Sequence, residues 1–115
     1  MIDLAYIDRV YLFHGVTDFR KGISGLYRLV LDSFQKNDMK NSLFLFCNKK
    51  RDSIKILEVL DTGIWLYQKR LFDGKFPYPE IDRQAIITPD KLKIIISGLD
   101  FIQALEKRES DILST

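Results

Sequence analysis

The sequence has 115 residues, of which 46% are apolar and 30% are charged, a composition typical of a single globular domain and not of a disordered chain. No run approaches the roughly 18 consecutive apolar residues of a membrane-spanning helix, and the N-terminus lacks the basic start and apolar stretch of a signal peptide. A single cysteine, Cys47, excludes an intrachain disulfide and a thiolate metal site, so the expected compartment is the reducing cytoplasm. We expect one domain over residues 1–115, with a core at about 9–99 and a tail or short helix at 100–115.

The net charge of +2 conceals an uneven distribution of charged residues. Between Arg20 and Lys75 the chain has 12 Lys and Arg against 6 Asp and Glu, whereas from Glu80 to Thr115 it has 5 against 7. The middle of the chain is therefore the part best suited to face an anionic partner.

The first predicted elements are a strand at 9–13 and a helix at about 17–35. The strand segment is rich in β-branched and aromatic residues and ends at His14-Gly15. The helix has an apolar stripe at helical spacing, formed by Phe19, Ile23, Leu26, Val30 and Phe34. Its first turn would contain Arg20 and Lys21, which the helix dipole disfavours there unless an anion binds between them. The alternative is that both are solvated, or that Arg20 pairs with an acid elsewhere on the sheet.

Three strands are expected next. Ser42–Cys47 is apolar at every position after Ser42, which is typical of a central strand covered on both faces. A charged hairpin loop, 48–52, leads to strands at 53–60 and 63–71, which are joined by Asp61-Thr62. Gly63, directly after this pair, can adopt the positive φ that a tight turn or bulge needs. One face of this hairpin would carry Ile54, Ile56, Trp65, Tyr67 and Lys69. The other would carry Leu57, Val59, Ile64 and Leu66, with Lys55, Gln68 and Arg70 at its far end.

A last helix is marked by Thr88 as N-cap, Pro89 at the first helical position and Gly98 at its end. Its apolar positions are Leu92, Ile95, Ile96 and Leu99, and Pro77 and Pro79 end regular structure before it. The order β-α-β-β-β-α predicts an α+β fold, in which helices pack on a small antiparallel sheet.

Catalytic chemistry has little support in the sequence. The single histidine, His14, lies far from Cys47 in sequence, and no HExxH, P-loop, GxGxxG or CxxC motif occurs. The acids Asp18, Asp52, Asp61 and Asp73 fall at predicted turns or caps, where aspartate commonly has a structural role. We therefore expect no enzymatic activity, no cofactor and no metal.

Binding chemistry is better represented, because cations gather in the hairpin loop and on the strands beside it. A sheet of this size with two helices can leave one face partly uncovered, and an aromatic patch rimmed by cations suits stacked bases or a partner protein. For Trp65 a place in the core is favoured over an exposed one, whereas for the basic loop a partner is favoured over solvation. The candidate binding residues are Arg20, Lys21, Lys49, Lys50, Arg51, Lys55, Trp65, Tyr67, Lys69, Arg70 and Lys75.

Several blocks of the sequence resemble one known family. They lie in order across about residues 9–99 and read VTDFRKGI (16–23), SLFLFCNKKRD (42–52), IKIL (54–57), GIWLYQKRL (63–71) and GKFPYP (74–79). The family is the small accessory protein TnpB, the second open reading frame of insertion-sequence-66-type elements, which is distinct from the RNA-guided nuclease of the same label. The sequence departs from the family pattern at Phe19, where methionine is usual, at Lys49-Lys50, where arginines are, and at Tyr78, where tryptophan is. The last change could alter a stacking contact.

The resemblance implies a role in transposition beside a separate, larger transposase that carries the acidic catalytic residues. It implies no catalytic site in this chain. We expect a non-catalytic accessory protein that contacts element-end DNA, the transposase, or both through a basic and aromatic surface. The alternative is a pure protein-interaction module that docks on the transposase without affinity for DNA.

Overall fold

The structure, a computed structural model, describes residues 4–15, 17–35, 39–80, 83 and 85–97. Within these residues five strands form one mixed sheet in the order β4-β3-β2-β1-β5. The strands are β1 (Arg9–Leu12), β2 (Ser42–Cys47), β3 (Ser53–Val59), β4 (Ile64–Arg70) and β5 (Ala85–Ile87), and the helices are η1 (Leu4–Tyr6), α1 (Ile23–Ser33) and α3 (Pro89–Ile96). The predicted α+β class is confirmed, and β5 and η1 are additions to the predicted order.

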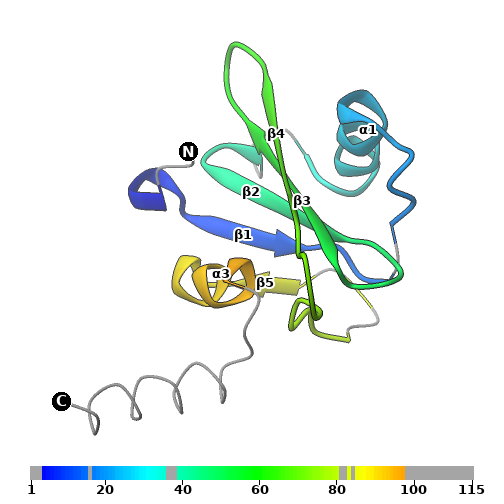
Figure 1. The fold of residues 1–115 in the computed structure, drawn as a ribbon. Helices are drawn as coiled ribbons and strands as arrows, with labels where there is room; N and C mark the ends of the chain where they lie inside the picture. Colours follow the sequence, from blue (N-terminus) through cyan, green and yellow to red (C-terminus); the bar gives the residue numbers. More distant parts are fainter. Residues whose placement is uncertain (1–3, 16, 36–38, 81–82, 84, 98–115) are drawn as a thin grey trace, which may run out of the picture.

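β2 lies at the centre of the sheet because both of its faces are apolar. Phe44 and Phe46 join the cluster that α1 covers, whereas Leu43 and Leu45 join the cluster that α3 covers. Every residue of β2 is buried, as its continuous apolar run predicts. Figure 1 shows α1 and α3 on opposite sides of the sheet. The protein is therefore built as helix, sheet and helix layers around one shared strand.

β1 and β2 run parallel, which corrects the prediction of an antiparallel sheet. Val10 is the partner of Leu43, and α1 lies in the connection between the two strands. Parallel neighbours need a connection of about a dozen residues or more, usually with a helix, and the segment between β1 and β2 provides one. β5 pairs antiparallel with β1 on its other side. It has no counterpart in the predicted order, because a strand of three residues is too short to show alternation.

The hairpin of β3 and β4 has the predicted register. Ile56 is opposite Tyr67 and Leu57 is opposite Leu66, so the two predicted faces are confirmed. The Leu60 N–H donates to the Gly63 carbonyl at 2.8 Å, which closes a two-residue turn at 61–62. Gly63 does not adopt a positive φ, so that expectation is wrong; among the described glycines the positive φ values belong to Gly15 and Gly74.

α1 begins six residues later than predicted, at Ile23 instead of position 17. The side chain of Asp18 accepts a hydrogen bond from the Arg20 N–H, and the Asp18 carbonyl accepts one from the Lys21 N–H. These bonds form a turn that competes with the helix. Gly22 is the N-cap and offers no side-chain oxygen. Leu26 and Val30 are buried, as the apolar stripe predicts, whereas Ile23 is 38% exposed.

α3 follows its sequence signals closely. The Thr88 Oγ1 accepts a hydrogen bond from the Lys91 N–H at 3.2 Å, Pro89 is the first helical residue, and Leu92 and Ile95 are buried. α1 ends at Ser33, two residues before the predicted end at about 35 and before Asn37-Asp38, where the helix was expected to stop. The predicted end of α3 at Gly98-Leu99 and the tail at 100–115 lie outside the described residues. In the described part of the chain, no helix has the length and apolar character needed to cross a bilayer.

Candidate nucleic-acid interface

A hydrogen-bonded hairpin turn, residues 48–52, closes the end of the sheet where β2 stops. The Asn48 side chain fixes it from inside: its Oδ1 accepts from the Ser53 N–H at 3.0 Å and its Nδ2 donates to Asp52 Oδ1 at 2.7 Å. This donation is the main reason that the pKa of Asp52 is lowered. Arg51 adopts a positive φ of 59° and donates its N–H to the Asn48 carbonyl. The backbone that carries Lys49 and Lys50 is therefore defined by its own hydrogen bonds.

A second loop, residues 71–75, lies against this turn. The Leu71 N–H donates to the Asp52 carbonyl at 2.8 Å, and the Phe76 N–H donates to the Arg51 carbonyl at 2.7 Å. Both ends of the loop are thus tied to the hairpin turn, which brings cations that are far apart in sequence to one end of the sheet. We call this surface the basic end and define it as Lys49, Lys50, Arg70, Phe72 and Lys75.

The cations of the basic end are largely free to meet a ligand. Lys49, Lys50 and Lys75 are exposed, and within the described part of the chain none of the three forms an ion pair. The Arg70 side chain is 75% exposed and lies 4.0 Å from Asp52, at the limit of an ion pair. An ion pair of this length at the surface contributes little stability, so Arg70 is available as well.

Arg51, predicted to be a binding residue, has partners inside the protein. Its Nη1 donates to the Tyr78 carbonyl at 3.0 Å, and its Nη2 lies 3.2 Å from Glu80 Oε1. Tyr78 in turn is buried, and its hydroxyl donates toward the carbonyls of Phe13 and Leu45, at 2.6 and 3.0 Å. Arg51 therefore holds the segment 76–80 against the ends of β1 and β2.

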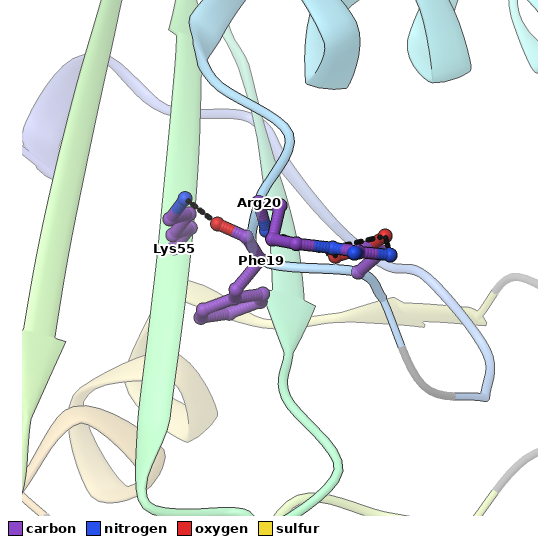
Figure 2. Close-up of polar contacts among 4 residues, drawn as sticks. Phe19, Arg20 and Lys55 are labelled. Carbon is purple, nitrogen blue, oxygen red and sulfur yellow. Dashed lines mark hydrogen bonds and ion pairs between the residues drawn. The ribbon is translucent and has the colours of Figure 1, made fainter.

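Lys55 is also turned inward. Its side chain is 6% exposed, and its Nζ donates to the carbonyls of Phe19 and Lys21, each at 3.0 Å. The Nζ also lies 4.8 Å from the centre of the Phe19 ring (Figure 2). Two carbonyl acceptors and an aromatic face satisfy the buried ammonium group. Lys55 thus fastens the segment before α1 to the sheet.

Arg20 and Lys21 precede the N-cap Gly22, so the prediction that they lie in the first turn of the helix is wrong. Arg20 instead makes a bidentate pair with Asp18 through Nε and Nη2, with a shortest distance of 2.8 Å (Figure 2). The hydrogen bonds from Arg20 lower the pKa of Asp18 to about 2, and the same pair raises the pKa of Arg20. The partner of Arg20 is therefore Asp18, two residues earlier in the chain, and not an acid on the sheet. Lys21 is exposed.

The hairpin face that carries Trp65 and Tyr67 is only partly covered. Trp65 is 59% exposed, so the prediction of a core position is wrong. It lies opposite Glu58, near the turn that joins β3 and β4. Its ring stacks on Tyr67, with centroids 6.3 Å apart, and the Tyr67 hydroxyl donates to Glu58 at 2.9 Å. The prediction of a partly uncovered face is correct.

An apolar groove of about 500 Å³ continues this face between the hairpin and the end of α3. Ile54, Ile56, Tyr67 and Ile96 are among the residues that line it. Lys69 also lines the groove, and its Nζ donates to the Ile96 carbonyl at 2.7 Å. This bond places a cation at the C-terminal end of α3, where the helix dipole favours it.

Phe72 is the residue that sequence reasoning missed. Its relative exposure is 110%, the highest of the large apolar side chains in the described part of the chain. The available signal was its position directly before Asp73-Gly74, a dipeptide typical of turns. An aromatic residue at such a turn has no strand or helix beneath which it can be buried.

The arrangement of the possible catalytic groups agrees with their structural interpretation. Cys47 is buried, and burial raises the pKa of its thiol to about 11, whereas His14 is exposed. The Asp73 carboxylate accepts a hydrogen bond from the Gly74 N–H, a local turn bond. Among the described residues, no three His, Cys, Asp or Glu side chains come together in a way that could hold a metal ion.

The fold and its surface define a small mixed-sheet α+β protein with a basic end and a separate apolar groove. The chain belongs to the family of IS66 Orf2-like proteins, whose model matches residues 8–106. It is therefore linked to the transposition of IS66-type insertion sequences.

Two relatives come from Sinorhizobium fredii (strain NBRC 101917 / NGR234). The uncharacterized protein y4hO is 32% identical over 94 residues, which cover 81% of this chain and 82% of the relative. The uncharacterized protein y4jC is 29% identical over 91 residues, which cover 78% of each chain. No solved structure matches the protein.

Proposed function

We propose that the protein is a non-catalytic accessory factor of transposition that contacts element-end DNA through its basic end. The observation that carries this proposal is the fixed geometry of the two loops. Their backbone hydrogen bonds bring the segments of Lys49, Lys50 and Lys75 together, and none of the three lysines forms an ion pair within the described residues. Exposed cations on a hydrogen-bonded backbone favour a polyanion, because binding a phosphate displaces solvent and counterions and breaks no ion pair within the described residues.

The experiment is a titration of fluorescently labelled element-end duplex with the purified protein across a series of salt concentrations. We expect the logarithm of the affinity to fall linearly with the logarithm of salt concentration. The double variant Lys49→Ala/Lys50→Ala should reduce that slope by about 2, since each neutralised phosphate contributes about 0.9.

The matched control is Lys40→Ala/Lys91→Ala, which removes the same charge from exposed positions away from the two loops. The slope should change less in this control than in the variant of the basic end. An absence of DNA affinity at low salt, or equal slopes in the two variants, would contradict the proposal.

The alternative function is docking on the element's transposase without any affinity for DNA. The apolar groove and the exposed ring of Trp65 favour it, because an apolar surface of this kind is typical of protein interfaces. It predicts that tagged transposase retains the protein after nuclease treatment and that Trp65→Ala weakens this retention. Lys49→Ala/Lys50→Ala should then leave it unchanged. Retention that disappears with nuclease would count against this alternative.

A further inference from the structure

The loop that carries Phe72 presents an aromatic ring to solvent on a defined backbone. Hydrogen bonds from Leu71 and Phe76 to the hairpin turn fix both ends of the loop. Gly74 adopts a positive φ of 80°, which only glycine reaches easily, and the Asp73 side chain accepts from its N–H. The full exposure of Phe72 is therefore a property of an ordered turn.

The neighbours of this ring restrict the kind of ligand. Arg70 and Lys75 flank it in sequence, and the turn with Lys49 and Lys50 is hydrogen-bonded to both ends of its loop. Asp73 is the acid within the loop, and its carboxylate is engaged with the backbone. A ligand that meets this surface must satisfy several positive charges and cover a flat apolar ring.

A nucleic acid strand with unpaired bases has both properties. Its phosphates match the lysines, and each unpaired base offers a flat face on which an aromatic side chain can stack. In a paired duplex the base faces are covered by their neighbours. An acidic peptide would satisfy the charges but provides no flat partner for the ring.

We infer that Phe72 stacks on an unpaired base of single-stranded or locally opened DNA, while Lys49, Lys50 and Lys75 contact the adjacent phosphates. This inference rests on the proposed DNA contact. It adds the class of nucleic acid that is bound and the residue that stacks on its base. The basic end then prefers a single strand over a duplex of the same sequence.

The experiment measures binding of the full chain to a labelled oligothymidylate and to a duplex of equal length. Phe72→Ala should weaken single-strand binding roughly 5- to 150-fold, the range of one base–aromatic stack, with little change in duplex affinity and in the salt slope. Phe72→Leu should lose as much, because it keeps apolar bulk without a ring, whereas Phe72→Trp should retain binding. A strand containing 2-aminopurine adds a direct signature: its fluorescence should be quenched by the wild type and not by Phe72→Ala.

The matched control is Tyr6→Ala, which removes another exposed aromatic ring, 74% exposed, from a different segment of the chain. It should bind the single strand as the wild type does. Two results would overturn the inference while leaving the proposed DNA contact intact, provided that duplex binding persists. One is equal single-strand affinity of Phe72→Ala and wild type. The other is that polyglutamate competes for the protein as effectively as an unlabelled single strand does. If neither duplex nor single strand binds at low salt, the proposed DNA contact itself fails.

Discussion

At the scale of single residues, equal charges have different roles that depend on what surrounds each side chain. Lys55 and Lys50 both lie in the β3 hairpin region, yet Lys55 is buried on two carbonyls and Lys50 is exposed. The sequence shows a cation at both positions and cannot separate them, because the acceptors of Lys55 come from residues more than 30 positions away. Arg51 and Lys69 were likewise predicted as binding residues and have internal acceptors.

The role of Lys55 can be tested through stability. We expect Lys55→Ala to lower the free energy of unfolding by about 1–3 kcal/mol, because the buried ammonium group and its hydrogen bonds to two backbone carbonyls are lost. Chemical denaturation followed by circular dichroism measures it. Lys75→Ala removes the same charge from an exposed site and should stay within about 0.5 kcal/mol of wild type. Equal effects of the two substitutions would contradict the structural role of Lys55.

The pair of Asp18 and Arg20 predicts a pH dependence. The folded pKa of Asp18, about 2, is lower than the ordinary value of 3.8, so its contribution to stability is present above about pH 4 and is lost as the pH falls through 2. An NMR titration of the Asp18 carboxyl group should have its midpoint near 2. The difference in stability between wild type and Asp18→Asn should shrink over the same interval. A midpoint near 3.8 would show that the pair does not persist in solution.

At the scale of elements, the sequence predicts best where signals are local. The boundaries of β2 agree with prediction, because they follow from a continuous run of apolar residues. The cap of α3 agrees as well, because it follows from the adjacent residues Thr88 and Pro89. The start of α1 was predicted too early, because the turn made by Asp18 competes with a helix whose apolar periodicity continues through Phe19. The groove depends on how the β3–β4 hairpin and α3 lie relative to one another, which no local pattern encodes.

The cap of α3 provides a test at this scale. Thr88→Ala removes the oxygen that accepts the Lys91 N–H and should cost about 1 kcal/mol of stability. Thr62→Ala, in the exposed turn between β3 and β4, is the control and should have a smaller effect. Thermal unfolding measures both variants. A Thr88→Ala variant as stable as Thr62→Ala would show that the cap contributes nothing.

At the scale of the whole molecule, β2 belongs to both apolar clusters, so the two faces of the sheet cannot unfold separately. We expect Phe44→Ala to lower the free energy of unfolding by about 3–5 kcal/mol through the cavity it leaves. Trp65, the single tryptophan, lies on the opposite face and reports on that side. In the wild type and in Phe44→Ala, the unfolding transition followed by Trp65 fluorescence should coincide with the one followed by far-ultraviolet circular dichroism. Two separated transitions would mean that the faces are independent.

The buried hydroxyl of Tyr78 has a consequence for variation among relatives. It bridges the carbonyls of two parallel strands from a site that solvent does not reach, and that burial raises its pKa. An indole N–H could donate to one of these carbonyls in place of the phenol hydroxyl. Because the side chain is buried, exchange between tyrosine and tryptophan here would act on packing inside the protein and not on an exposed stacking surface.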